Sequence, residues 1–307
     1  MPRLPASERG FGRPAFRRAA ETAVAVVIRL MGWVAIVVLA AIAVFLLVNS
    51  FTAISTVGLI PMLTGTAWYP TSTPPQFGMV PLIAGSLLVT VIAVVLSVPV
   101  GVASAVYVSE FAPKWLKEPM KSIIEFMAAV PSVVYGLLGL AFIVPWVAKG
   151  FQQASGLSAL AGGIVLSLMA LPTIISISED ALHAVPDGLR QGSLALGNTR
   201  WQTTYKVTLP AASSGVFAAI MLGVGRAIGE TMAVLMVTGN AAVIPTSVFD
   251  SVRTMTGTIA TEMGEAVQGG EHFSVLFTIG LVLFAITFAI NFAADIVLEK
   301  ERQRWRR

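Results

Sequence analysis

Two ionisable residues interrupt one of the longest apolar stretches of the chain. Arg226 and Glu230 are the only charged residues between Ala211 and Val237. Four residues separate them, so a continuous helix places both side chains on one face, near enough to pair. A charge near the middle of a membrane costs at least ~2.5–3.5 kcal/mol, and such residues are by default functional. This pair is therefore the first candidate for chemistry.

Two interpretations of the pair follow from its chemistry. In the one that we favour, Arg226 lines a route through the membrane and binds a passing oxyanion with its planar, bidentate fork. Glu230 then holds Arg226 between passages and keeps binding weak enough for release. In the other, the pair is structural and locks helices together. Gly225 and Gly229 have the small-xxx-small spacing that favours close helix packing.

The composition is that of a membrane protein. Of 307 residues, 56% are hydrophobic and only 12% are charged, about half the charged share of a soluble domain. With no cysteine, disulfides and Cys-ligated metals are excluded. His183 and His272 lie far apart without metal-ligand spacing, and one or both are expected to face solvent. The net charge of +4 is attributed to membrane topology, so no nucleic-acid binding is inferred.

Six apolar blocks are each long enough to cross roughly 30 Å of hydrocarbon as a helix. Helices are required there because lipid cannot satisfy backbone polar groups. The sequence therefore predicts an all-α membrane protein with six transmembrane helices. The blocks are Leu30 to Val48, Pro81 to Val108, Phe126 to Ala148, Leu157 to Ser178, Ala211 to Val237 and Phe273 to Ala294.

The distribution of basic residues predicts the orientation. With the N-terminus inside, all but three of the 20 Lys and Arg residues fall on the cytoplasmic side; Lys149 and Arg253 are outside and Arg226 is within a span. This bias predicts a multi-pass plasma-membrane protein with both termini cytoplasmic. The predicted segments are a basic cytoplasmic tail (1–22), a first transmembrane helix (23–48), an outer loop (49–80), a core with five transmembrane helices and a cytoplasmic loop at 179–209 (81–298), and a basic cytoplasmic tail (299–307).

The sequence makes further predictions for two of the segments that connect the spans, the outer loop at 49–80 and the loop at 179–209. In the outer loop, Trp68 and Tyr69 are expected at the membrane interface. In the loop at 179–209, Pro186 suits a first helical turn, Gly197 a helix stop, and Thr199 to Gln202 a capping box. The result is a knob of two short helices. It either docks into a groove on a partner or lies on the membrane surface, and the pattern alone does not decide between the two.

The same loop resembles the coupling loop of ABC-transporter permeases. That family pattern has Glu-Ala-Ala, then Gly four residues further on, an apolar residue, a spacer and Leu-Pro. Gly197 and Leu209-Pro210 fall at the family spacing, whereas Gln191-Gly192-Ser193 departs from Glu-Ala-Ala. In the family this loop sits in a cleft of the ATP-hydrolysing subunit. The resemblance thus implies that Gln191, Gly192, Ser193, Gly197, Leu209 and Pro210 couple to an ATPase.

The resemblance extends from about Asn49 to Leu298. The stretch from Gly225 to Val234 is similar to the fifth-helix motif of phosphate-importer permeases. The stretch from Leu63 to Pro70 resembles the first outer loop of PstC-type subunits, and that from Ala129 to Gly136 matches the start of the third core helix. The resemblance implies a type I ABC importer permease fold and phosphate import. It also implies as partners a PstA-type second permease subunit, an ATP-binding subunit dimer and an extracytoplasmic phosphate-binding protein.

Other functions stay open or are disfavoured. The sequence has no P-loop of the form G-x-x-x-x-G-K-[ST], so ATP is expected to be used by a partner chain and no cofactor is expected here. An intramembrane enzyme is disfavoured by the lack of His-Glu-x-x-His and Gly-x-Ser-x-Gly. The alternatives are an ABC permease for another oxyanion, such as sulfate or molybdate, and a stand-alone secondary transporter.

Overall fold

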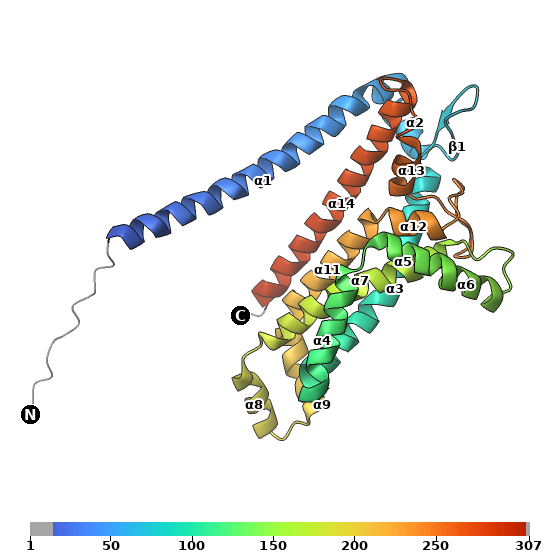
Figure 1. Cartoon of the computed structure of the whole chain (residues 1–307). Coiled ribbons are helices and arrows are strands. Elements are labelled where there is room, and N and C mark those ends of the chain that lie inside the picture. Colours follow the sequence, from blue (N-terminus) through green and yellow to red (C-terminus); the bar gives the residue numbers. More distant parts are fainter. Residues whose placement is uncertain (1–14, 305–307) are drawn as a thin grey trace, which may run out of the picture. The chain divides into compact units, whose positions relative to one another are not determined.

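The computed structural model describes residues 15–304, and it leaves out the side chains of 15–22, 297, 298 and 300–304 (Figure 1). Of the predicted tails at 1–22 and 299–307, residues 1–14 and 305–307 lie outside the described residues. The chain divides into an N-terminal unit, residues 1–48, and a core unit, residues 49–307.

A single helix, α1 (Ala15–Thr56), makes up the described part of the N-terminal unit and continues into the core unit. Its segment Ala23–Thr56 has a mean hydropathy of 2.9 in its most apolar window, and no side chain of that window is buried. The helix runs past Val48, where the sequence suggested that the first span ends. No helix breaker occurs there, and the chain turns only at Gly58, whose φ is +91°.

The core unit is built mainly from helices, with a longer non-helical segment at 238–254. Its first part has a small antiparallel hairpin followed by a long helix, and its middle part contains three π-helical turns labelled η. The elements are α2 (Leu59–Thr64), β1 (Trp68–Tyr69), β2 (Gln76–Phe77), α3 (Val80–Val106), η1 (Tyr107–Phe111), α4 (Lys114–Ala129), α5 (Ser132–Leu138), η2 (Gly139–Ile143), α6 (Val144–Gly150), α7 (Ala159–His183), α8 (Asp187–Ala195), α9 (Arg200–Thr203), η3 (Thr204–Thr208), α10 (Leu209–Ala211), α11 (Ser213–Gly229), α12 (Met232–Val237), α13 (Met255–Glu262) and α14 (Glu271–Arg304).

The prediction of six membrane spans is confirmed when one bent helix pair counts as a single span. Among the described residues, five helical segments are long and apolar enough to cross a membrane. The sixth is the pair Arg200–Ala211 and Ser213–Gly229, which bends by 71°. The five segments are Ala23–Thr56, Val80–Phe111, Ser132–Gly150, Ala159–His183 and Glu271–Ile296.

Two predicted blocks are not continuous helices. The third, Phe126 to Ala148, breaks at Val130 and Pro131, so the span begins only at Ser132. Proline cannot donate the backbone hydrogen bond that would continue α4, and it disfavours helical backbone at the residue before it. The fifth, Ala211 to Val237, breaks at Glu230, whose backbone is extended. This second break changes the interpretation of the charged pair.

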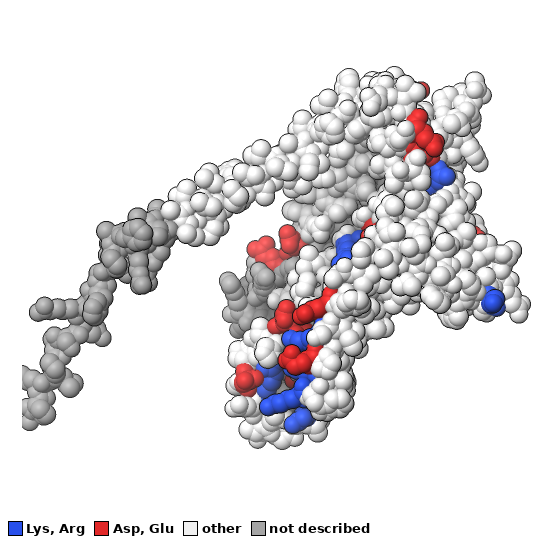
Figure 2. Space-filling model, viewed as in Figure 1, with Lys and Arg blue, Asp and Glu red and all other residues white. Residues whose placement is uncertain are grey.

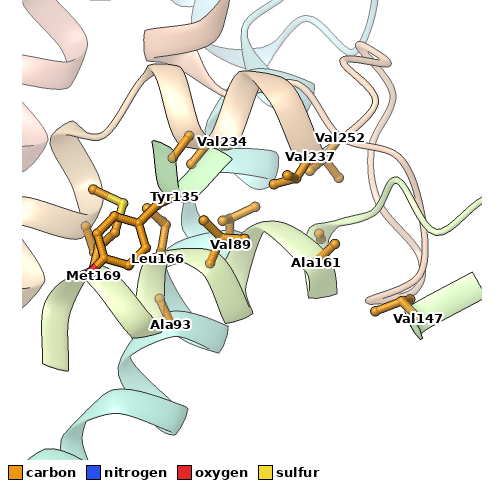
Figure 3. Packing of buried hydrophobic residues seen from close by; sticks show 14 residues of the cluster. Val89, Ala93, Tyr135, Val147, Ala161, Leu166, Met169, Val234, Val237 and Val252 are labelled. Carbon is orange, nitrogen blue, oxygen red and sulfur yellow. The ribbon is translucent and has the colours of Figure 1, made fainter. Parts of the chain in front are cut away.

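Helix α7 lies at the centre of the core unit. More than half of its most apolar window, 56%, is buried, compared with 33% or less for the other unbent spans. Its residues Ala161, Leu166 and Met169 pack with Val89 and Ala93 of α3 and with apolar side chains of α5, α6 and α12 (Figure 3). A second apolar cluster surrounds Trp68, Met79 and Leu276, and a third surrounds Ala105, Leu182 and Val216.

Charged side chains are concentrated at the two ends of the core unit. On the face drawn in Figure 2, they gather mainly at the end that carries α8 and α9 and in a smaller group near α13. The stretch between these groups is largely uncharged, as a surface in contact with lipid requires. The core unit therefore has two polar ends and an apolar middle.

Close contact between α3 and α7 depends on glycine. A Cβ at Gly163 would collide with the Ile92 side chain, whereas a Cβ at Gly150 would meet no described atom within 4 Å. We expect Gly163→Ala to lower the free energy of unfolding by ~1–3 kcal/mol, the usual cost of overpacking, and Gly150→Ala to have little effect. Thermal unfolding of the purified protein in detergent is the measurement. Equal midpoints for the two variants would show that this contact does not constrain the fold.

Candidate translocation and coupling sites

Arg226 lies in the last turn of α11, within an apolar span. Its side chain is exposed, and Nη1 donates a hydrogen bond of 3.4 Å to Oγ1 of Thr173 in α7. Hydrocarbon does not tolerate an exposed guanidinium, so the face that carries Arg226 must meet water or another chain.

The predicted pairing of Arg226 with Glu230 is wrong. No ion pair joins these two described residues, because α11 ends at Gly229 and Glu230 leaves the helix with φ −71° and ψ 136°. Glu230 instead accepts a 3.3 Å hydrogen bond from the backbone N–H of Ala233 in α12. Its backbone carbonyl accepts another, of 2.9 Å, from Thr256 Oγ1 in α13. Glu230 therefore stabilises a break between two helices.

The glycines near Arg226 serve two different purposes. Gly223 packs on α7, where an added Cβ would lie 2.7 Å from the Ile174 side chain. A Cβ added at Gly225 or Gly229, which the sequence suggested for helix packing, would meet no atom of the described chain within 4 Å. They leave the surface beside Arg226 bare, so an ion, water or a neighbouring subunit has room to approach it.

The predicted knob forms as two short helices. Gly197 ends the first with φ +84°. The Thr199 side chain caps the second, and the Gln202 side chain bonds back to the Thr199 backbone N–H. The second helix continues through η3 and α10 to the 71° bend that leads into α11. The knob is thus connected directly to the helix that carries Arg226.

Ser193 does not lie on the docking surface that the resemblance implied. It is buried, and its Oγ lies 2.9 Å from Thr203 Oγ1 and accepts a hydrogen bond of 3.1 Å from Asn198 Nδ2. These bonds join the two helices of the knob. Gln191, Gly192 and Gly197 are exposed, as a docking surface requires, whereas Leu209 and Pro210 are half-buried near the bend.

The knob also exposes apolar side chains that the sequence analysis did not select. Leu196 is 86% exposed, and Leu189 and Leu194 are exposed as well. Apolar residues at helical spacing on an exposed face are typical of a helix that docks into a groove. The sequence carries this signal in the spacing of Leu189 and Leu196, which lie seven residues apart and so share one face of a helix.

Arg190 connects the knob to the membrane helices, a role that the sequence analysis missed. Its guanidinium donates to Oε1 of Glu110 in η1, at 3.0 and 3.3 Å, and to Asp187 at 3.0 Å. It also donates to the carbonyls of Leu182 and Val185 at the end of α7, at 2.7 and 2.6 Å. The side chain is only 18% exposed. One arginine therefore ties α8 to both α7 and the end of α3.

A second ion pair at this end joins α4 to α7. Lys121 Nζ lies 2.8 Å from Glu179, whose side chain is buried. The hydrogen bond to Glu179 raises the pKa of Lys121 above its ordinary value. The pair stabilises the fold fully below the pKa of an unfolded lysine, and the effect is lost as the pH rises through the folded pKa. Deprotonation of Lys121 in strong alkali would therefore weaken the tie between α4 and α7.

At the opposite end, Glu262 of α13 connects several segments. Its Oε1 accepts hydrogen bonds from Arg253 at 2.6 Å and from Trp68 at 3.1 Å, and its Oε2 lies 2.9 Å from His272 Nε2. Trp68 is therefore buried against these side chains, whereas Tyr69 is exposed, and His272 is held by Glu262 and mostly buried. His183 is exposed, as expected.

The comparisons with known proteins agree with this geometry. The family described as "Binding-protein-dependent transport system inner membrane component" matches residues 97–306. Among solved structures, the bacterial alginate ABC transporter in complex with its periplasmic protein aligns with a TM-score of 0.61 at 11% identity, over 90% of this chain and 93% of that one. The inward-facing MetNI methionine ABC transporter gives 0.56 at 21% identity, over 71% and 93%. The fold is that of type I ABC importer permeases.

The chain belongs to this family of inner-membrane permease components, which are transport subunits and not enzymes. Within it, the likeness is to phosphate permeases. The chain is 35% identical over 282 residues to the phosphate transport system permease protein PstC of Mesorhizobium japonicum, covering 86% of this chain and 85% of the relative. The PstC protein of Haemophilus influenzae is 33% identical, with 87% and 89% covered. The probable ABC transporter permease protein YqgH of Bacillus subtilis is 44% identical, with 81% of each covered.

The contacts of Arg190 predict a mechanical role. Arg190→Lys keeps the charge but cannot make the five hydrogen bonds that Arg190 donates to four acceptor atoms, so α8 should loosen. We expect amide hydrogen exchange over 187–195 to rise about 10-fold or more, since hydrogen bonds to a charged group contribute ~1.5–3 kcal/mol. Arg200→Lys, at an exposed position on the same knob, is the matched control. Unchanged exchange in Arg190→Lys would contradict the proposed tie.

Proposed function

We propose that this chain is one half of the translocation pathway of an ATP-driven phosphate importer. The similarity to PstC proteins from several bacteria over most of the chain supports phosphate as the cargo. The observation that carries the proposal is Arg226, an exposed guanidinium on an apolar span beside two bare glycines. A planar fork of N–H donors matches a phosphate oxyanion.

The absence of an ion pair with Glu230 supports binding by Arg226. A guanidinium held by a carboxylate would have to break that pair for each ion, whereas Arg226 makes one long hydrogen bond to Thr173. Weak binding of the ion by Arg226 suits transport, because the ion must also leave the site. Glu230 then acts as a positioning residue, whose contacts with Ala233 and Thr256 hold the helix break open next to Arg226.

The remaining surfaces support a set of partners. A PstA-type second permease subunit completes the pathway over the face of Gly225 and Gly229. A dimer of ATP-binding subunits binds the knob, and Leu196 is among the residues that it contacts. That dimer hydrolyses the ATP, so this chain needs no cofactor. An extracytoplasmic phosphate-binding protein docks at the end that carries the hairpin and α13. This arrangement requires both termini on the cytoplasmic side of the plasma membrane.

The test of the proposal is phosphate uptake by variants of Arg226. Arg226→Gln should reduce uptake about 10- to 100-fold, the loss expected when one charge-assisted contact of ~1.5–3 kcal/mol disappears. Arg226→Lys keeps the charge without the fork and should retain part of the activity. Radiolabelled phosphate uptake, normalised to assembled complex in the membrane, is the measurement.

A matched control removes a positive charge elsewhere. Lys149→Gln, at an exposed position at the end of α6, should leave uptake unchanged. Full uptake by Arg226→Gln would exclude Arg226 from the pathway. Uptake of labelled sulfate or molybdate, without uptake of labelled phosphate, would assign the chain to another oxyanion.

Two glycines of the knob provide a test of coupling. Gly188 of α8 and Gly197 are both exposed, and a Cβ added at either would meet no described atom within 4 Å, but only Gly197 has positive φ. Gly188→Ala should stabilise α8 by ~0.5–1 kcal/mol, whereas Gly197→Ala should cost ~1–2 kcal/mol in the left-handed conformation. We expect only Gly197→Ala to lower phosphate-stimulated ATP hydrolysis by the assembled complex. The reverse order of effects would exclude the Gly197 turn from coupling.

A further inference from the structure

An apolar groove of about 630 Å³ lies between α3 and the bent segment that joins α9 to α11. Its walls include Pro99 and Ala103 of α3 and Phe217 and Ile220 of α11, and its lining is almost entirely apolar. The volume is within the ~300–1,000 Å³ of ordinary small-ligand sites. The groove therefore has room for a flexible hydrocarbon ligand.

The groove does not belong to the proposed pathway. Phe217 and Arg226 are nine residues apart on α11, which is two and a half turns of a helix with 3.6 residues per turn. They therefore point to opposite sides of α11. Since Arg226 requires water or a partner chain, the opposite side is free to face lipid.

The mouth of the groove combines aromatic side chains with a positive charge. Trp201 and Tyr205 line it, both exposed, and their rings lie 6.1 Å apart, while Phe111 lies 6.0 Å from Trp201. The exposed Lys206 places Nζ 5.5 Å from the Tyr205 ring centroid. Trp and Tyr favour the headgroup level of a membrane, and basic residues there attract anionic lipids.

We propose that this groove binds an anionic phospholipid of the adjoining leaflet, with an acyl chain along α3 and α11 and its phosphate at Lys206. The apolar lining fits the chain, and the lysine fits the headgroup. The site lies at the 71° bend between the knob and the Arg226 helix. A bound lipid therefore supports the bend and makes coupling dependent on lipid composition, whichever oxyanion is transported.

Trp201 serves as a probe of the groove. The full-length chain, purified with its bound subunits, is reconstituted in nanodiscs of phosphatidylcholine that contain brominated phosphatidylglycerol or, separately, brominated phosphatidylcholine. Bromine quenches nearby tryptophan, and the difference between the wild type and Trp201→Phe isolates the signal from Trp201. We expect phosphatidylglycerol to be preferred about fivefold, from the ~1 kcal/mol that one lysine contributes at an anionic membrane surface.

Four variants separate the parts of the proposal. Lys206→Gln should abolish the preference and Lys206→Arg should keep it. Ala103→Phe, which fills the groove from an exposed position, should remove the Trp201 signal, whereas Val95→Phe, exposed on α3 outside the groove, should not.

Two results would overturn the proposal. Equal quenching by both lipids, unchanged in Lys206→Gln, would mean ordinary contact with bulk lipid. A Trp201 that neither lipid quenches would mean that a protein partner fills the groove. Neither result depends on phosphate transport, so the lipid site and the proposed function can fail separately.

Discussion

Hydrocarbon cannot solvate an ionised guanidinium, and the arrangement around Arg226 follows from that constraint. The side chain is exposed on a helix whose composition belongs in a membrane, so the surface around it has to be covered by water or protein. The bare backbone at Gly225 and Gly229 leaves space for that cover. The break at Glu230 adds polar backbone at the same level, and such backbone is tolerated only where it lines a cavity or is buried in protein. The chain therefore carries one half of a polar route and requires a second half.

The same constraint explains why the polar contacts of the core unit are placed at its two ends. Glu262 gathers Trp68, Arg253 and His272 at one end, and Arg190 gathers carbonyls and carboxylates at the other. Between them, α3 and α7 pack through glycine and small apolar residues, as helices do where no hydrophobic driving force acts between them. The helices are thus held together by van der Waals packing in the membrane part and by charge-assisted hydrogen bonds at the two ends.

The sequence was sufficient where the determinants are local. Long apolar blocks identify spans because lipid demands them, and the Gly197 turn and the Thr199 capping box are correct because their partners lie within a few residues. It failed where the partner is distant. The break at Glu230 depends on Thr256, which is 26 residues away. The burial of Ser193 depends on Thr203 in the next helix. The hydrogen bonds of Arg190 depend on Glu110, which is 80 residues earlier in the chain. Spacing alone could not identify any of these partners, so the ion pair inferred from an i,i+4 pattern was wrong.

These ties suggest how a movement of the knob reaches the pathway. Arg190 attaches α8 to the end of α7, and the second helix of the knob continues through the 71° bend into α11. Helix α7 carries Thr173 and α11 carries Arg226, so the knob is connected separately to the two helices whose side chains meet at the candidate site. If the two connections were equally stiff, the knob would move both helices together and the site would not change. One connection runs through the hydrogen bonds of Arg190 and the other through the backbone at the bend, so a displacement of the knob can shift α11 against α7. The 3.4 Å hydrogen bond between Arg226 and Thr173 is long, and it is the contact that such a shift would break first.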